Sequence, residues 1–288
     1  MWGFTRRDLT LPTGHMACWH KPESAGKPRL LMGHGNGLTA LCQFALMDIL
    51  GAEFDVHALD FRGHGATRLP TPLIPDDPWG FYENDLKSVI DAHFGGRVRF
   101  AGHSLSGAVA LRLARWQPDM FQGLVCLDPP FLSMAAHRAL TLARHFSPLM
   151  RTVRLYRGAL KRRDNWISRE EALAYFTGRK ALASWPQSAV AAYVETGLVP
   201  APDGGLTLSC DKAWEARTYK FVASELPQSL HKITCPTLII RADFGSLYKR
   251  QLTLWPSTRL INVKGDHFVH IQHPDKIAAH MANFLRNH

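Results

Sequence analysis

A serine stands at the corner between a predicted strand and a predicted helix, in the stretch GHSLSG at residues 102–107. Residues 98–101 have the apolar character of a strand, and residues 105–114 have that of an amphipathic helix. A turn this tight lifts the hydroxyl of Ser104 clear of the sheet and points the first N–H groups of the helix at any anion formed beside it. Gly-x-Ser-x-Gly is the sequence of such a turn; here Ser106 takes the place of the second glycine, and Gly107 follows it. We therefore predict that Ser104 is a nucleophile rather than a simple turn residue.

A serine hydroxyl attacks efficiently only when a base takes its proton and a third group orients that base. His267, which follows the last predicted strand, is the best-placed base. Asp243 follows the strand TLIIRA and gives the chain order Ser, Asp, His that accompanies this kind of turn. Asp128 follows the strand LVCL and is the alternative acid, although DPP also forms ordinary strand-ending turns. From strand position we favour Asp243 over Asp128.

Nucleophilic attack on a carbonyl also requires N–H donors for the oxyanion. We predict that these donors are the backbone N–H of Leu105, directly after the serine, and that of Asn36 in the turn GHGNG. Losing one such donor costs about 2.7–4 kcal/mol of transition-state stabilisation. Gly35 and Gly37, which shape that turn, are therefore predicted to be chemically necessary.

Other polar residues near the strand ends have simpler interpretations. His34 and His64 lie between glycines in tight turns, and we expect them to brace these turns by hydrogen bonds. The guanidinium of Arg62 is expected to do the same. Histidines also follow the predicted base at positions 270 and 273, but no other ligand pattern supports a metal site there. We predict neither a metal nor an organic cofactor.

Short apolar runs alternate with helical patterns along most of the chain. Runs that begin near residues 29, 55, 98, 123, 235 and 257 predict strands, and residues 40–50, 80–94 and 274–287 predict helices. Continuous apolar strands separated by helices indicate a parallel sheet covered on both faces, in which ligands bind beyond the carboxyl ends of the strands. Since the nucleophile, the acid, the base and the oxyanion turn all follow such strands, the pattern predicts one site at that edge.

Residues 131–230 break the alternation and look mostly helical. We interpret them as a helical cap inserted over the strand ends, and residues 1–130 and 231–288 as the core. Within the cap, residues 138–163 hold eight Lys and Arg residues and no Asp or Glu. Leu149, Val153, Tyr156 and Leu160 have helical spacing, which predicts one amphipathic helix with a basic face. That face is either simply solvated, the plainer interpretation, or attracts an anionic substrate, carrier or lipid surface.

The cap is also rich in aromatic residues. They either line an apolar acyl pocket or form the cap's own core, and the sequence does not divide them between these roles. They are Trp166, Tyr175, Phe176, Trp185, Tyr193 and Trp214.

The composition, 46% hydrophobic and 20% charged over 288 residues, is that of a soluble globular protein. Five scattered cysteines, odd in number and without a motif, predict reduced thiols in the cytoplasm. No signal-peptide pattern opens the sequence, and no run approaches the roughly 18 apolar residues of a membrane span. The net charge of +10 does not predict nucleic-acid binding, because no recognised module accompanies it. The expected partner is a small acyl substrate, apolar or anionic; the oligomeric state is left open.

Five motifs together resemble the α/β-hydrolase superfamily, in particular its single-chain members with a helical cap. The motifs are HGNG at His34, DFRGHG at Asp60, GHSLSG around Ser104, LIIRAD at Asp243 and GDHF at His267. The resemblance covers about residues 30–135 and 230–288. It implies an α/β fold with an eight-stranded, mostly parallel sheet, and hydrolysis by a Ser-His-Asp triad. Members of this superfamily whose own carboxylate becomes alkylated carry an aspartate at the strand-to-helix corner where this chain has Ser104. A serine at that position therefore favours acyl transfer.

We therefore predict a carboxylesterase-like serine hydrolase that cleaves an ester or a related acyl compound through an acyl-enzyme. Cleavage of a C–C bond beside a ketone, lactone hydrolysis and perhydrolysis of an acid are alternatives that use the same triad. A non-catalytic binding protein on the same fold is a further alternative, against which the intact set of serine, histidine and aspartate argues.

Overall fold

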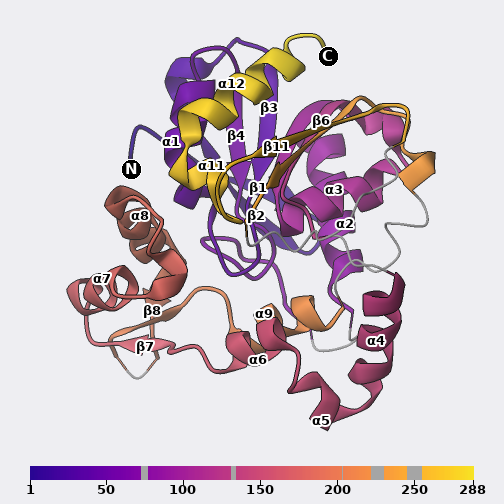
Figure 1. Cartoon of the computed structure of the whole chain (residues 1–288). Helices are drawn as coiled ribbons and strands as arrows, with labels where there is room; N and C mark the ends of the chain where they lie inside the picture. The colour runs from indigo at the N-terminus through magenta and orange to yellow at the C-terminus, as the bar shows by residue number, and fades with distance from the viewer. Residues whose placement is uncertain (73–76, 131–133, 203, 222–229, 245–254) are drawn as a thin grey trace.

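An eight-stranded sheet forms the centre of the molecule (Figure 1). The computed structural model describes residues 1–72, 77–130, 134–202, 204–221, 230–244 and 255–288. The strands of the sheet are β1 (Thr5–Leu11), β2 (Gly14–His20), β3 (Arg29–Gly33), β4 (Asp55–Leu59), β5 (Val98–His103), β6 (Phe121–Leu127), β10 (Thr237–Ala242) and β11 (Thr258–Val263).

The strand order is β1-β2-β4-β3-β5-β6-β10-β11. Strand β2 pairs antiparallel with both β1 and β4, and every other neighbouring pair is parallel. The predicted mostly parallel, eight-stranded sheet is therefore confirmed. The antiparallel hairpin of β1 and β2 adds an edge that the alternation of strands and helices did not indicate.

Helices cover both faces of the sheet (Figure 1). One face carries α1 (Phe44–Leu50), α11 (Val269–Gln272) and α12 (Pro274–Leu285), and the other carries α2 (Trp79–His93) and α3 (Leu105–Ala114). Short 3-10 helices occur in the connections: η1 (Pro22–Ser24), η2 (Ala40–Gln43), η3 (Pro118–Met120) and η5 (Leu230–Lys232).

The strands are apolar on both faces because each face packs against helices. In β3, Leu30 and Met32 belong to the apolar layer beneath α1 and α12, whereas Leu31 belongs to the layer beneath α2 and α3. All three side chains are fully buried. This alternation across the sheet explains why the strands read as continuous apolar runs.

A long insertion separates β6 from β10, and Figure 1 shows it gathered on one side of the sheet. We call residues 134–221 the insertion. The predicted cap boundary at residue 131 lies outside the described residues, and the cap remains a prediction as a functional unit. Its elements are α4 (Met134–His145), α5 (Ser147–Met150), α6 (Arg154–Leu160), β7 (Asn165–Trp166), α7 (Arg169–Thr177), η4 (Lys180–Leu182), α8 (Gln187–Gly197), β8 (Leu198–Pro200), β9 (Leu206–Leu208) and α9 (Lys212–Lys220). The small antiparallel sheet β7-β9-β8 was not predicted.

The prediction of one continuous basic helix through residues 149–160 is wrong. The chain forms α5 and α6 with a break between them, where Val153 is extended (φ −69°, ψ 111°). Arg151, Arg154 and Arg157 recur at intervals of three, and like charges at that spacing destabilise a helix. Leu149 and Leu160, meant for an apolar face, stay 44% and 41% exposed.

Candidate active site

The predicted nucleophile occupies a strained corner between β5 and α3. Ser104 follows the last residue of β5 and has φ 49° and ψ −106°, a conformation that costs a non-glycine residue about 1–3 kcal/mol. Its amide nonetheless continues the sheet, since Ser104 N–H donates to the carbonyl of Leu127 at 2.9 Å. The sharp strand-to-helix turn predicted around Ser104 is therefore present.

Close backbone contact explains the glycines around this corner. A Cβ on Gly102 would lie 2.5 Å from the backbone nitrogen of Gly107, and one on Gly107 would lie 2.7 Å from the carbonyl oxygen of Gly102. Ser106, which stands where a second glycine is usual, lies against Gly33 of β3. A Cβ on Gly33 would approach the Ser106 Cβ to 2.5 Å. The missing side chain at Gly33 therefore makes room for this serine, a compensation the sequence analysis missed.

Three side chains form a hydrogen-bonded line at the carboxyl edge of the sheet. The Nε2 atom of His267 lies 3.1 Å from the hydroxyl oxygen of Ser104. The Nδ1 atom of the same ring lies 2.6 Å from Oδ2 of Asp128. The carboxylate is almost fully buried, and its Oδ1 accepts from the Ala242 N–H at 3.3 Å. With the ring proton on Nδ1, His267 donates to Asp128 and is free to accept from Ser104.

The structure places Asp128, and not the favoured Asp243, beside the imidazole of His267. Asp243 is exposed, and its Oδ1 accepts from the Gly265 N–H at 2.9 Å instead of contacting the imidazole. This hydrogen bond connects the end of β10 to the loop that leads to His267. Asp128, the alternative, has φ 42°, a left-handed conformation that accompanies its contact with the ring. Both aspartates follow neighbouring parallel strands at one edge, so strand position could not separate them.

The turn predicted to hold the oxyanion lies directly beside the nucleophile. A Cβ on Gly35 would be 3.4 Å from the Ser104 Cβ. Gly37 has φ +74°, which favours glycine. The side chain of Asn36 donates through Nδ2 to the carbonyl of Glu215 at 3.0 Å. The proposed donors, the N–H groups of Asn36 and Leu105, thus belong to segments that flank Ser104 on two sides, and their role remains a prediction.

Two buried histidines brace this turn, as predicted. His34 accepts from the Phe61 N–H at Nε2 (3.0 Å) and donates from Nδ1 to the carbonyl of Gly35 (2.8 Å). His64 accepts from the Gly37 N–H at Nε2 (2.9 Å) and donates from Nδ1 to the carbonyl of Arg62 (3.0 Å). Each ring must be neutral to accept at Nε2. Burial lowers the pKa of His34 to about 4 and that of His64 to about 3.

Two further histidines pack beneath the imidazole of His267. His103 donates from Nε2 to the carbonyl of His267 at 3.0 Å, and its ring packs against that of His270 with centroids 4.1 Å apart and planes tilted by 39°. Burial lowers the pKa of His103, and burial with the neighbouring His267 lowers that of His270 to about 3. In the described part of the chain, His267, His270 and His273 do not form a group suited to a metal ion.

We expect the free energy of unfolding to fall steeply as the pH drops below about 6.5. The unfolded chain then binds protons on His34, His64, His103 and His270. The folded protein takes these protons up only at lower pH, because burial lowers the pKa of all four rings, to about 4 for His34 and to about 3 for His64 and His270. Below about pH 6.5, each of these histidines lowers the free energy of unfolding by up to about 1.4 kcal/mol per pH unit. Urea unfolding at pH 7.5, 6.0 and 5.0 measures the slope. His270→Phe should lower the number of protons taken up on unfolding by about one, while the exposed control His145→Gln should leave it unchanged. An unfolding free energy that does not change with pH would contradict the expectation.

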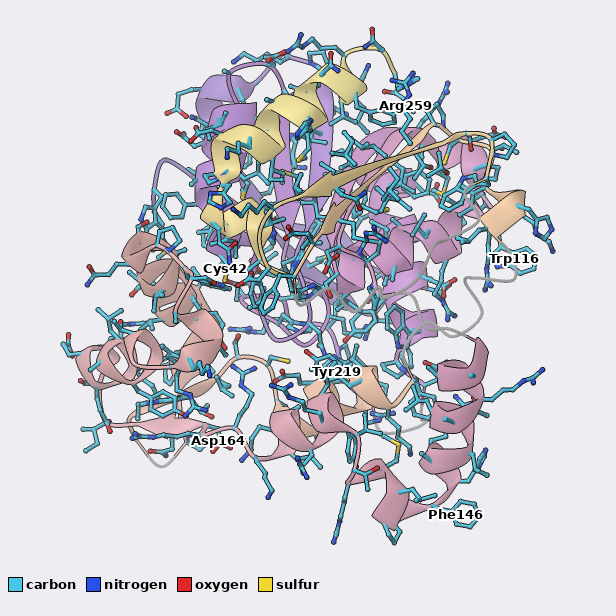
Figure 2. The ribbon with its side chains drawn as sticks, viewed as in Figure 1. Cys42, Trp116, Phe146, Asp164, Tyr219 and Arg259 are labelled. Carbon is cyan, nitrogen blue, oxygen red and sulfur yellow. The ribbon has the colours of Figure 1, made fainter. Side chains whose placement is uncertain are left out.

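A buried polar cluster of the insertion contacts the oxyanion turn, and the sequence analysis did not identify it. Arg162 donates to Oε2 of Glu215 at 2.6 Å and also to the hydroxyl of Tyr193. A Cβ on Gly37 would lie 2.7 Å from Oε1 of Glu215. Figure 2 labels Tyr219, which comes from the same helix, α9, as Glu215. In the sequence, only the run of basic residues around Arg162 indicated this cluster, because Tyr193 and Glu215 are distant from Arg162 in the chain.

The aromatic residues of the insertion mostly form its own core. The side chains of Trp166, Phe176, Trp185 and Tyr193 are buried together in one apolar cluster. Trp214 instead packs on the sheet domain, where it donates to the carbonyl of Arg62 at 3.2 Å. These residues therefore attach and stabilise the insertion.

The five cysteines are free and buried. Among the described helices, none combines the length and the apolar character that crossing a membrane requires.

The fold and the serine corner define the class to which the protein belongs. The Alpha/beta hydrolase family matches residues 30–280, so the chain is a member of that family and an enzyme of the hydrolase class. The 2-(acetamidomethylene)succinate hydrolase of Mesorhizobium japonicum is 27% identical over 275 residues, which are 91% of this chain and 90% of that protein. Serine hydrolase-like protein 2 of Homo sapiens is 25% identical over 303 residues, 96% of this chain and 93% of that one.

Solved structures share the fold over nearly the whole chain. The crystal structure of E-2-(acetamidomethylene)succinate hydrolase aligns with a TM-score of 0.79 and 24% identity, covering 98% of this chain and 99% of that one. A thioesterase domain from the curacin biosynthetic pathway aligns with a TM-score of 0.76 and 17% identity, covering 97% and 99%.

Proposed function

We propose that this hydrolase cleaves a carboxylic ester, or a closely related acyl compound, through an acyl-enzyme on Ser104. The observation that carries the proposal is the hydrogen-bonded line from Ser104 through His267 to Asp128. A hydroxyl, an imidazole and a buried carboxylate in this order make a serine nucleophilic. The serine hydrolase-like relatives support the same chemistry.

Each proton in the proposed reaction passes through His267. Ser104 Oγ attacks the carbonyl carbon while Nε2 takes the hydroxyl proton, and the carbonyl π electrons move onto oxygen. The tetrahedral intermediate collapses, and the leaving alcohol departs with the proton from Nε2. Water then gives a proton to Nε2 and attacks the acyl carbon, which releases the acid and returns the proton to Ser104. Asp128 keeps the ring in the required tautomer and stabilises its cation.

The oxyanion in this scheme is bound by the N–H groups of Leu105 and Asn36. Leu105 begins α3, so its N–H adds to the positive end of the helix dipole. The two histidines beneath the turn, His34 and His64, keep Gly35 and Gly37 in place without adding charge. A rigid pair of donors stabilises the transition state without reorganisation.

A second candidate substrate is an acyl compound that carries a carboxylate. The observation that favours it is a pocket on the insertion lined by the basic side chains of Arg154, Arg157, Lys161 and Arg162 together with Glu215 and Tyr219. Glu215 offsets only the charge of Arg162, to which it is paired. The Mesorhizobium relative is named as a hydrolase of 2-(acetamidomethylene)succinate, itself an anionic acylamino compound.

Labelling by a fluorophosphonate probe tests the nucleophile. Wild-type protein should be labelled and should hydrolyse p-nitrophenyl butyrate, and Ser104→Ala should lose both activities. Ser106→Gly, which creates the usual sequence of the corner, is the matched control and should still be labelled. Equal labelling of Ser104→Ala would remove Ser104 from the mechanism. A wild-type protein inert to probe and esters alike would favour the non-catalytic alternative.

The same assay separates the two substrate classes. Esters of equal chain length, one ending in a methyl group and one in a carboxylate, are compared by kcat/KM. A preference for the carboxylate that shrinks with salt and in Arg157→Gln would support the anionic substrate. Equal rates, or a preference for the methyl ester, would leave the neutral ester as the substrate class.

A further inference from the structure

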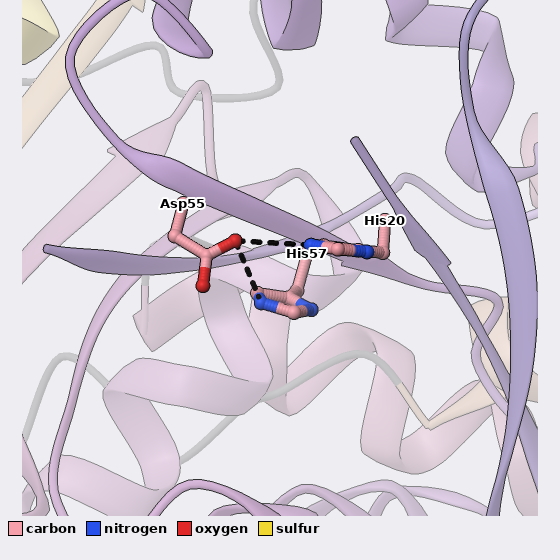
Figure 3. A group of neighbouring side chains, drawn as sticks. All are labelled: His20, Asp55 and His57. Atoms are coloured by element: carbon pink, nitrogen blue, oxygen red, sulfur yellow. Dashed lines mark hydrogen bonds and ion pairs between the residues drawn. The ribbon is translucent and has the colours of Figure 1, made fainter. Parts of the chain in front are cut away.

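Two histidines and an aspartate converge on one point between β2 and β4 (Figure 3). The Nε2 atom of His20 lies 3.1 Å from Oδ1 of Asp55, and the Nε2 atom of His57 lies 3.2 Å from the same oxygen. His20 and His57 are directly paired across the antiparallel strands. Their rings stack with centroids 4.5 Å apart and planes 14° apart, so both Nε2 atoms face the same side.

We propose that these three residues bind a Zn²⁺ ion. In tetrahedral zinc sites the metal–ligand bonds are about 2.0–2.1 Å long, which places neighbouring ligand atoms about 3.3–3.4 Å apart. The two nitrogen–oxygen distances in the cluster are close to this value, and all three ligand atoms lie within 4.8 Å of one another. Two imidazoles and a carboxylate are a preferred donor set for zinc, with water as the fourth ligand.

The surroundings keep the proposed ligands in position. The ring of Phe94 meets His57 edge-on at 5.2 Å, and the sulfur of Cys18 lies 4.0 Å from its Nδ1 atom. The side chains of His57 and Asp55 are 9% and 11% exposed, and that of His20 is 25% exposed, which gives the ion a route from solvent.

The proposed site is separate from the hydrolytic residues and would act on the fold. Asp55 begins β4, whereas Ser104, His267 and Asp128 meet beyond the carboxyl ends of β5 and β6. The β2–β4 ladder contains three residue pairs, of which His20 with His57 is the last. A zinc ion on this pair would fasten the β1–β2 hairpin to the parallel sheet. Arg7, which pairs with Cys18 across β1 and β2, carries a positive charge that would oppose a bound cation.

Calorimetric titration of the chelator-treated protein with ZnCl₂ tests the proposal. The wild type should bind one zinc ion per chain at this site, and its Tm should rise with zinc. His20→Gln, which changes the most exposed ligand, should weaken binding by at least about tenfold. The exposed control His145→Gln should bind like the wild type. Protein carrying His267→Ala should also retain binding, which separates this site from the imidazole beside Ser104.

A crystal of the zinc-treated protein provides the second measurement. An anomalous peak bonded to His20, Asp55 and His57 would support the site, together with an unchanged Tm of metal-free His20→Gln. Absence of zinc binding at micromolar concentrations, unchanged affinity in His20→Gln, or a peak on other residues would show that the cluster is a hydrogen-bonded group without a metal.

Discussion

Asp128→Asn is expected to lower kcat about ten-thousandfold while the fold remains intact. The asparagine amide can donate to Nδ1 of His267, which holds the ring proton on Nε2. That nitrogen then cannot accept from the hydroxyl of Ser104, although the distance of 3.1 Å between them need not change. Steady-state kinetics with p-nitrophenyl butyrate give kcat, and circular dichroism checks the fold.

Asp243→Asn is the matched control, because the same change is made at the end of the neighbouring strand. The asparagine oxygen can still accept from the Gly265 N–H, so kcat should fall by less than about tenfold. The ratio between the two variants is the informative quantity. A large loss in Asp243→Asn with normal activity in Asp128→Asn would show that the acid changes partners during the reaction.

The location of the candidate site could be predicted because its signals are local. Ser104 lies within one short stretch that specifies strand, turn and helix, and the glycines on either side report the close approach of backbone. The apolar runs place the ends of β3, β5, β6 and β10 at one edge, since parallel strands share their direction. His34 and His64 were also interpreted correctly, because a histidine between glycines in a tight turn has few partners other than backbone.

The choice of acid depends on geometry that is not written locally. Asp128 and Asp243 both follow apolar strands, and β6 and β10 are neighbours. What separates them is the left-handed backbone of Asp128 and the path of the loop that carries His267. Neither can be read from the spacing of residues in one stretch.

Clusters assembled from distant segments were missed for the same reason. Arg162 and Glu215 are 53 residues apart in the chain, and they meet because α6 packs against α9. His20 and His57 are brought together by the antiparallel pairing of β2 with β4, which the alternation of strands and helices did not indicate. The prediction of one basic helix through residues 149–160 was wrong for a different reason. The spacing of its apolar residues was helical, but its like charges repel each other, and Leu149 and Leu160 stay exposed.

Asp85→Ala is expected to lower the free energy of unfolding by about 3–5 kcal/mol. Asp85 on α2 accepts two hydrogen bonds from Arg62, from Nε at 2.7 Å and from Nη2 at 2.6 Å, and the side chains are only 7% and 4% exposed. Removing the carboxylate leaves a guanidinium charge buried without its counterion, which costs more than the pair itself contributes. Urea unfolding followed by tryptophan fluorescence measures the loss.

The control lies on the same helix, where Lys87 and Asp91 form an exposed ion pair, 41% and 47% exposed. Asp91→Ala should lower the free energy of unfolding by less than about 0.5 kcal/mol.

The double variant Arg62→Met with Asp85→Ala provides a second control. It should lower the free energy of unfolding by less than the two single changes added together, because it buries no unpaired charge. Arg62 also carries the carbonyl that orients His64 beneath Gly37, so folded samples of the single variants should hydrolyse p-nitrophenyl butyrate more slowly than the wild type. Two outcomes would show that the buried Arg62–Asp85 pair does not stabilise the fold in this way. One is additive losses of unfolding free energy in the double variant, and the other is a loss for Asp85→Ala as small as that for Asp91→Ala.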